Sequence, residues 1–165
     1  MSTGEKEVFD RLAGLQNSKT VILGIGNTLK GDDGAGCIVC QRLSGKINAE
    51  LINAGTVPEN YIQVIIKKKP QALVVIDAVD FKAKPGTIKV FEPEQLDSFI
   101  ISTHTLSPRI FIEMICSNIE VDVYFVGIQP ARIELTEQIS ERVERAIDFL
   151  GEILTEIFSI ERKIR

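Results

Sequence analysis

Histidine is almost absent from this chain. His104 is the only histidine among the 165 residues. Zinc proteases of the HExxH type need two imidazoles on one helix, and zinc hydrolases with three histidine ligands need three. Both designs are excluded, and a metal site in this chain must draw most of its ligands from other side chains.

The chain also lacks an excess of positive charge and a long apolar run. Its 19 Lys and Arg residues stand against 23 Asp and Glu residues, which leaves a formal net charge of −4. This balance does not favour nucleic acid or an anionic membrane as a partner. No apolar run approaches the roughly 20 residues of a membrane span, and residues 1–19 lack the hydrophobic stretch of a signal peptide. We therefore expect a cytoplasmic protein that binds neither nucleic acid nor membrane.

Cysteine and aromatic residues are few. Three cysteines, an odd number, predict free thiols in a reducing compartment and not a disulfide framework. The chain has no Trp, 8 Phe and 2 Tyr, so we expect a core of branched aliphatic side chains. A length of 165 residues suits a single domain.

Segments of strand type alternate with segments of helix type along nearly the whole chain. The strands are expected at 20–25, 49–53, 72–78, 86–91 and 121–126, and the helices near 8–15, 35–43, 58–66, 108–116 and 139–158. The apolar run ALVVIDA at 72–78 is typical of a central strand covered on both faces. This order predicts a single α/β domain, a three-layer α/β/α sandwich with a mostly parallel twisted sheet.

A glycine-rich loop, GIGNTLKGDDG at residues 24–34, follows the first predicted strand and precedes a helix, where α/β proteins bind phosphate groups. It fits neither common phosphate motif. Leu29 replaces the third glycine of the dinucleotide pattern GxGxxG, and Asp32 and Asp33 replace the Lys and Ser or Thr of a Walker A loop. Because two carboxylates repel phosphate and attract cations, a nucleotide-binding module is the least favoured hypothesis. Asp32 also suits the N-cap of the following helix, which would explain it without a ligand.

A second acidic segment, with Asp77 and Asp80, ends the predicted central strand. Ligands of open α/β sheets bind at the carboxyl ends of the strands, so Asp33 and Asp77 are expected to lie together. His104 lies in a polar loop before a predicted helix and can join them. One imidazole and two carboxylates can hold a divalent ion such as nickel or zinc and leave positions open for a substrate. Asp32 or Asp80 is a candidate general base, with helix capping and loop hydrogen bonding as the alternatives.

Cys37 and Cys40 form a CxxC pair in the predicted helix 35–43, a spacing that also occurs in redox motifs and metal sites. There is no second CxxC, and Cys116 is distant in sequence, so a closed four-thiolate site cannot form within one chain. Positions i and i+3 of a helix lie on one face, which here is apolar and favours plain packing. No GxSxG or SxxK pattern indicates a serine nucleophile.

Together these motifs resemble those of the maturation endopeptidases of nickel-iron hydrogenases, especially the branch that processes hydrogenase 3 type enzymes. Residues 26–36 resemble the N-terminal signature of that family. Further matching segments follow in the family's order: PEN at 58–60, DAVD at 77–80, PG at 85–86, TH at 103–104 and GIQP at 127–130. The resemblance covers about residues 20 to 150. It implies a protease-like domain at 20–165, preceded by an N-terminal extension, residues 1–19, that carries a short helix.

The resemblance also implies an activity. Members of the family remove a C-terminal extension from the precursor of the hydrogenase large subunit after nickel insertion. Their metal-binding positions, two acids and one histidine, correspond to Asp33, Asp77 and His104. The implied enzyme is a nickel-dependent endopeptidase, of aspartic type by family, whose nickel comes from the substrate; zinc or cadmium can substitute. The alternative is a nickel-binding chaperone or sensor that uses the same three residues without proteolysis.

Overall fold

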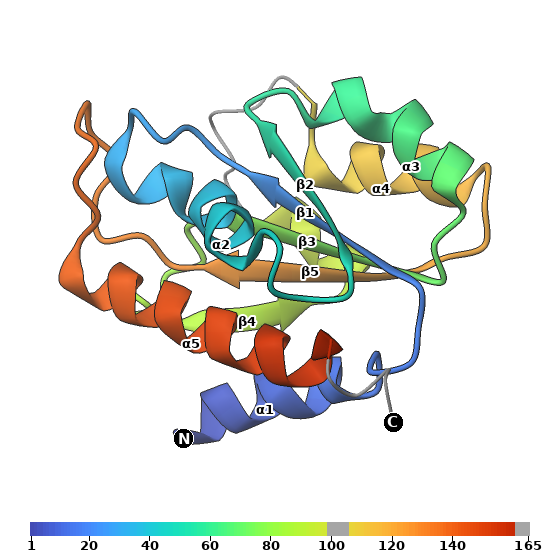
Figure 1. Cartoon of the computed structure of the whole chain (residues 1–165). Coiled ribbons are helices and arrows are strands. Elements are labelled where there is room, and N and C mark those ends of the chain that lie inside the picture. Colours follow the sequence, from blue (N-terminus) through green and yellow to red (C-terminus); the bar gives the residue numbers. More distant parts are fainter. Residues whose placement is uncertain (99–105, 161–165) are drawn as a thin grey trace.

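A computed structural model describes residues 1–98 and 106–160 of the chain, which are organised around a five-stranded sheet (Figure 1). The strands are β1 Thr20–Ile25, β2 Glu50–Gly55, β3 Ala72–Ala78, β4 Ile88–Phe91 and β5 Asp122–Ile128. Their order is β2-β1-β3-β5-β4. β2, β1, β3 and β5 pair in parallel, whereas β4 pairs antiparallel with β5. The predicted mostly parallel sheet is confirmed.

The central strands are buried on both faces. Every residue of β1 and of β3 is buried, which explains why their sequences are apolar without alternation. In β2, at one edge of the sheet, Ile52 and Ala54 are buried while Asn53 between them is exposed. This is the pattern of a strand covered on one face.

Helices cover both faces of the sheet and complete the predicted three-layer sandwich (Figure 1). On one face, α1 Thr3–Ala13, α2 Ala35–Leu43 and α5 Glu141–Ile157 share a core with strand residues such as Ile22, Val74 and Val126. On the other face, α3 Ile62–Lys68 and α4 Pro108–Cys116 pack against Leu23, Val75 and Phe125. Short 3₁₀ helices, η1 Gly31–Gly34, η2 Pro58–Tyr61 and η3 Pro93–Ser98, lie in the connections. In the described ranges, no helix is long and apolar enough to cross a membrane.

The predicted bounds of four elements agree with the structure: strands 20–25 and 72–78 and helices 35–43 and 108–116. β5 ends at Ile128, beyond the predicted end at Val126. The prediction stopped early because Gly127 has no side chain that could extend the apolar pattern. β4 begins at Ile88 because Gly86, with φ 85°, lies in the preceding turn. The predicted helix 58–66 is divided into η2 and α3.

Two glycines allow α2 and its N-terminal turn to lie directly on the carboxyl ends of the strands. A Cβ at Gly36 would overlap the carbonyl oxygen of Ile76 and lie 2.7 Å from that of Ile25. Gly26 has φ 148°, and a Cβ there would overlap the carbonyl oxygen of Asp33. Only glycine permits these approaches, so both residues place the η1 turn at the end of the sheet.

Candidate functional site

Loops that follow β1, β2, β3 and β5 form the carboxyl edge of the sheet, toward the left of Figure 1. Backbone hydrogen bonds join them. The N–H of Gly26 donates to the carbonyl oxygen of Gly55 over 2.9 Å, and the N–H of Gly31 donates to that of Thr136 over 2.7 Å. This edge therefore holds the acidic segments that follow β1 and β3.

Asp33 lies in η1 and is 1% exposed. Its Oδ2 accepts a hydrogen bond from the N–H of Asn27 over 3.0 Å. The backbone of Asp33 packs directly against Gly26, where there is no room for a side chain, and this contact fixes the turn. The carboxylate thus has a defined position in a buried setting.

Asp77 is the penultimate residue of β3 and is fully buried. It pairs with Gly127 of β5, where a Cβ would come within 2.6 Å of Val79 and 2.7 Å of Phe91. Side chains alternate along a strand, so Asp77 lies on the same face as Val75, the face covered by α3 and α4.

The thiol of Cys37 interacts with both carboxylates. Burial raises its pKa to about 11; a hydrogen bond with the Gly55 backbone opposes the increase, and the charges of Asp77 and Asp33 add to it. Both carboxylates are therefore near one buried sulfur. The η1 turn that carries Asp33 packs against β3, which carries Asp77, so both residues lie at the same edge of the sheet. Their roles stay a prediction.

His104, the third predicted metal ligand and catalytic residue, lies outside the described residues, as does the Thr103 of the same motif. Within 1–98 and 106–160, no group of three His, Cys, Asp or Glu side chains is arranged to hold a metal ion. The described part of the site is the carboxylate pair.

Asp32 has a different environment from its neighbour Asp33. It is fully buried, and its oxygens accept four hydrogen bonds: from the N–H groups of Ala131 at 2.9 Å, Arg132 at 3.2 Å and Ser140 at 2.8 Å, and from the Ser140 hydroxyl at 2.7 Å. Burial alone would raise the pKa of Asp32, but these hydrogen bonds outweigh it and lower the pKa. The alternative that Asp32 caps the following helix is wrong, because neither η1 nor α2 has a side-chain cap. Asp32 instead binds the loop between β5 and α5.

Asp80 is exposed and serves as a loop acceptor. It accepts hydrogen bonds from the N–H of Lys82 at 3.0 Å and from Nε2 of Gln129 at 3.1 Å, which lower its pKa. Gln129 is buried, and its Oε1 accepts from the N–H groups of Phe81 at 2.8 Å and Ala83 at 3.3 Å. Of the two interpretations of Asp80, the structure supports the hydrogen-bonding one. Gln129 fixes the 80–83 loop, a role that the sequence did not indicate.

Glu59 is a further acid at this edge, in η2 after β2. Its Oε2 is buried and has no hydrogen-bond partner within the described parts of the chain. The sequence marked this residue only as part of the PEN motif. Its burial depends on the path of the chain after β2, which the motif does not specify.

Cys37 and Cys40 are buried free thiols. The Sγ of Cys37 lies 3.4 Å from the carbonyl oxygen of Gly26, and that of Cys40 lies 3.8 Å from the carbonyl oxygen of Ile52. Burial raises the pKa of Cys40 to about 12. Neither sulfur is a thiolate at neutral pH, which supports packing over redox or metal chemistry for this pair.

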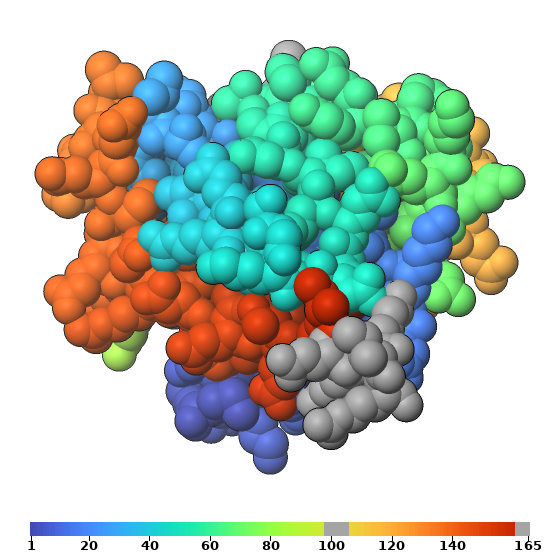
Figure 2. All heavy atoms as spheres, viewed as in Figure 1, coloured from blue at the N-terminus to red at the C-terminus, as the bar shows by residue number. Residues whose placement is uncertain are grey.

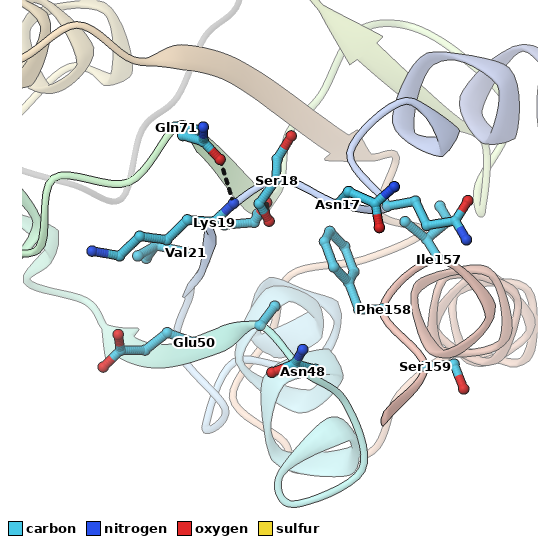
Figure 3. Close-up of a pocket in the computed structure, with 13 residues that line it drawn as sticks. Asn17, Ser18, Lys19, Val21, Asn48, Glu50, Gln71, Ile157, Phe158 and Ser159 are labelled. Atoms are coloured by element: carbon cyan, nitrogen blue, oxygen red, sulfur yellow. Dashed lines mark hydrogen bonds between the residues drawn. The ribbon is translucent and has the colours of Figure 1, made fainter. Parts of the chain in front are cut away.

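A cavity of about 490 Å³ lies at the opposite edge of the sheet, at the amino ends of β1, β2 and β3 (Figure 3). Lys19, Glu50 and Gln71 are among its lining residues, and Oε1 of Gln71 accepts a hydrogen bond from the N–H of Lys19 over 2.8 Å. Neither Asp33 nor Asp77 lines it. The acidic site is thus separate from this cavity.

A family model, a curated relative and two solved structures that are similar to this chain are all hydrogenase maturation proteases or endopeptidases. A model of the HycI family, described as hydrogenase maturation protease, matches residues 39–157. The hydrogenase 3 maturation protease of Escherichia coli K12 is 30% identical over 131 residues, covering 78% of this chain and 83% of that protein. The crystal structure of the NiFe hydrogenase maturation protease HycI from Thermococcus kodakarensis KOD1 has a TM-score of 0.81 at 31% identity and covers 89% of this chain and 97% of that one. The solution structure of the endopeptidase HycI from Escherichia coli has a TM-score of 0.76 at 29% identity, with 84% and 90% covered.

Proposed function

Because this chain belongs to the hydrogenase maturation protease family and is a peptidase, we propose that it removes the C-terminal extension of a nickel-iron hydrogenase large-subunit precursor after nickel has been inserted. The nickel belongs to the substrate. We expect the reaction in the cytoplasm, where the precursor would be processed before assembly.

The observation that carries the proposal is the placement of two buried acids, Asp33 and Asp77, where the η1 turn packs against β3. Two carboxylates at one buried place can bind a divalent cation, which offsets their negative charge. Their oxygens are suitable ligands for a first-row metal, and an imidazole completes the set that nickel prefers. Asp77 lies on the face covered by α4, and His104 precedes the first residue of α4 by four positions in the sequence.

The proposed role of Asp33, Asp77 and His104 is to bind the nickel of the precursor and so hold the neighbouring peptide bond at the site. A bound nickel ion can polarise a carbonyl group or lower the pKa of a water molecule. Asp32 and Asp80 are not proposed as general bases, because their oxygens already accept the hydrogen bonds that hold two loops.

The test is cleavage of a nickel-loaded precursor, followed by mass spectrometry of its C-terminus. We expect Asp33→Asn and His104→Ala to reduce the rate by about 100-fold or more, because each removes a metal contact. Asp122→Asn is the matched control, since Asp122 is an exposed aspartate at the amino end of β5, and should cleave at the wild-type rate. Precursor without nickel should keep its extension.

Complete processing by both site variants would contradict the assignment of these residues. Equal cleavage of nickel-free and nickel-loaded precursor would contradict the nickel dependence. Tight nickel binding by the wild-type protein without any cleavage would instead favour the chaperone or sensor function.

A further inference from the structure

The η1 turn, which carries Asp33, has weak internal support. It is a 3₁₀ helix of four residues, Gly31–Gly34, without a side-chain cap, and the hydrogen bonds of a 3₁₀ helix have poorer geometry than those of an α-helix. The N–H of Asp33 donates to the carbonyl oxygen of Lys30 over 3.3 Å, which is longer than the usual range for a backbone hydrogen bond. The conformation of the turn therefore depends largely on contacts with other parts of the chain.

The loop between β5 and α5, residues 129–140, supplies such contacts. The N–H of Gly31 donates to the carbonyl oxygen of Thr136 over 2.7 Å, and the N–H of Thr136 donates to the carbonyl oxygen of Leu29 over 3.0 Å. The four hydrogen bonds that Asp32 accepts come from residues 131, 132 and 140 of the same loop. Figure 2 shows this loop, in orange, beside the blue segment that follows β1. The turn is thus held from outside, through its backbone and through one buried carboxylate.

Ser140 binds Asp32 and does not cap the helix that it precedes. It occupies the N-cap position of α5 without a side-chain cap. A serine at this position ordinarily accepts a hydrogen bond from the first turn of the helix and stabilises it. Here its hydroxyl donates to Oδ2 of Asp32 over 2.7 Å, and its N–H donates to Oδ1 over 2.8 Å. The residue that could stabilise α5 stabilises the η1 turn.

Asp32 can act on the reaction only through its neighbour, because it is fully buried and both of its oxygens accept hydrogen bonds from the loop. Consecutive residues of a 3₁₀ helix project about 120° apart, so Asp32 and Asp33 leave the turn in different directions. Oδ2 of Asp33 accepts from the N–H of Asn27 over 3.0 Å. Holding the first carboxylate therefore restricts the direction of the second.

We propose that Asp32 is a positioning residue which, through its hydrogen bonds to the 129–140 loop and to Ser140 in particular, holds the Asp33 carboxylate in the orientation that binds the nickel of the precursor. This inference rests on the proposed function, in which Asp33 is a nickel ligand. A ligand must be held within about 0.5 Å of its productive position, and groups that hold ligands affect a metal site almost as strongly as the ligands do.

The amide of Asn27 reports the position of the Asp33 carboxylate, to which it donates, without metal or precursor. In ¹H–¹⁵N spectra of the full chain, Asp32→Asn and Ser140→Ala should move the Asn27 signal. Ser140→Thr keeps the hydroxyl and should leave the signal in place. Leu12→Ala is the control for lost stability, because Leu12 is fully buried in α1; it should also leave the Asn27 signal in place.

Cleavage of the nickel-loaded precursor shows whether this position matters. At a temperature at which every variant is folded, Ser140→Ala should lower kcat/KM about tenfold and Asp32→Asn about 10–100-fold, as for other groups that orient metal ligands. Ser140→Thr and Leu12→Ala should keep the wild-type value. In the Asp33→Asn background, Asp32→Asn should cause no further loss, because Asp32 acts only through Asp33.

Independent losses that multiply in the double variant would show a merely structural role and overturn the positioning role, and so would an Asn27 signal that neither Asp32→Asn nor Ser140→Ala moves. Both outcomes leave the proposed function intact. Failure of the wild-type protein to cleave the precursor would overturn the proposed function instead. The Asn27 spectra still test the hold of Asp32 on Asp33 in that case, because they need no substrate.

Discussion

Asp32 and Asp33 show that two identical neighbouring residues can serve separate purposes. Asp33 accepts from the N–H of Asn27 within its own loop, whereas Asp32 accepts from residues about 100 positions away in sequence. At the residue scale, the difference depends on which direction each carboxylate takes from a four-residue turn. A turn held in this way keeps the Asp33 carboxylate in place.

The pH dependence of stability should reveal the charge on Asp32. Its hydrogen bonds lower its pKa in the folded state below the ordinary value of 3.8, so its contribution to stability is present above pH 3.8 and is lost as the pH falls through the lowered folded-state pKa. We expect Asp32→Asn to reduce the free energy of unfolding by about 3 kcal/mol at pH 7. The NH₂ group of asparagine is itself a donor and cannot accept the hydrogen bonds that Ala131, Arg132 and Ser140 donate to the carboxylate.

Urea unfolding of wild type and Asp32→Asn from pH 7 to pH 2 measures this difference, which should shrink in the acid range. Asp10→Asn, at an exposed position of α1, is the control and should change little at any pH. A difference for Asp32→Asn that is constant across this range would rule out a charged Asp32 in the folded state.

The sequence was sufficient to predict that Asp33 and Asp77 lie at the same edge of the sheet, because Asp33 follows one buried strand, Asp77 ends another, and the carboxyl ends of parallel strands meet at one edge. It could not predict the partners of Asp32 or Gln129, because those contacts join loops that only tertiary packing brings together. Cys37 is an intermediate case. Its place on an apolar helix face was predicted, but its proximity to two carboxylates depends on how α2 meets the sheet.

At the scale of elements, the close contact between α2 and the sheet determines where the site is built. Four elements could be bounded correctly from apolar runs and from proline or glycine at their ends, as in the helix that begins at Pro108. The ends of other elements could not be predicted in this way, because a residue such as Gly127 belongs to a strand without adding to its apolar pattern. The role of Gly36 could not be predicted either, because it depends on the close contact of Gly36 with the carbonyl groups of Ile25 and Ile76, which only the fold creates.

Gly36→Ala should displace α2 from the ends of β1 and β3. The added methyl group would overlap the backbone of Ile76, which cannot move without disturbing the sheet, so we expect a loss of about 2–3 kcal/mol in the free energy of unfolding. Gly151→Ala in α5 is the control, because no atom lies within 4 Å of its added Cβ. That variant should gain about 0.5–1 kcal/mol from helix propensity.

Chemical denaturation of both glycine variants provides the comparison. Unchanged stability of Gly36→Ala would mean that α2 has room to shift. In that case the placement of the η1 turn would not depend on the glycine.

At the scale of the whole molecule, α1 is part of the same core as the sheet. Val8, Leu12 and Leu15 are buried in the cluster that also contains Ile88, Val90 and residues of α5. A capping box between Ser2 and Glu5 begins the helix. The first residues of the chain therefore contribute to the packing of the antiparallel edge strand β4.

Leu12→Ala should lower the free energy of unfolding by about 2–5 kcal/mol, as for other fully buried leucines. Leu12 is 0% exposed. Lys6→Ala, on the exposed side of α1, should stay within about 0.5 kcal/mol of wild type. Thermal and urea unfolding give both values, and equal stability of the two variants would show that α1 adds nothing to the core.

The hydrogen bonds from Ser140 to Asp32 span 108 positions of the sequence, which has a consequence for the order of events during synthesis. A ribosome adds about 5–20 residues per second, so the η1 turn emerges on the order of ten seconds before the residues that hold it. Until then the Asp32 carboxylate lacks the partners that bind it in the folded chain. The hydrogen bonds from Ser140 to Asp32 can therefore form only after residue 140 has been synthesised, so the η1 turn acquires its native contacts late in translation.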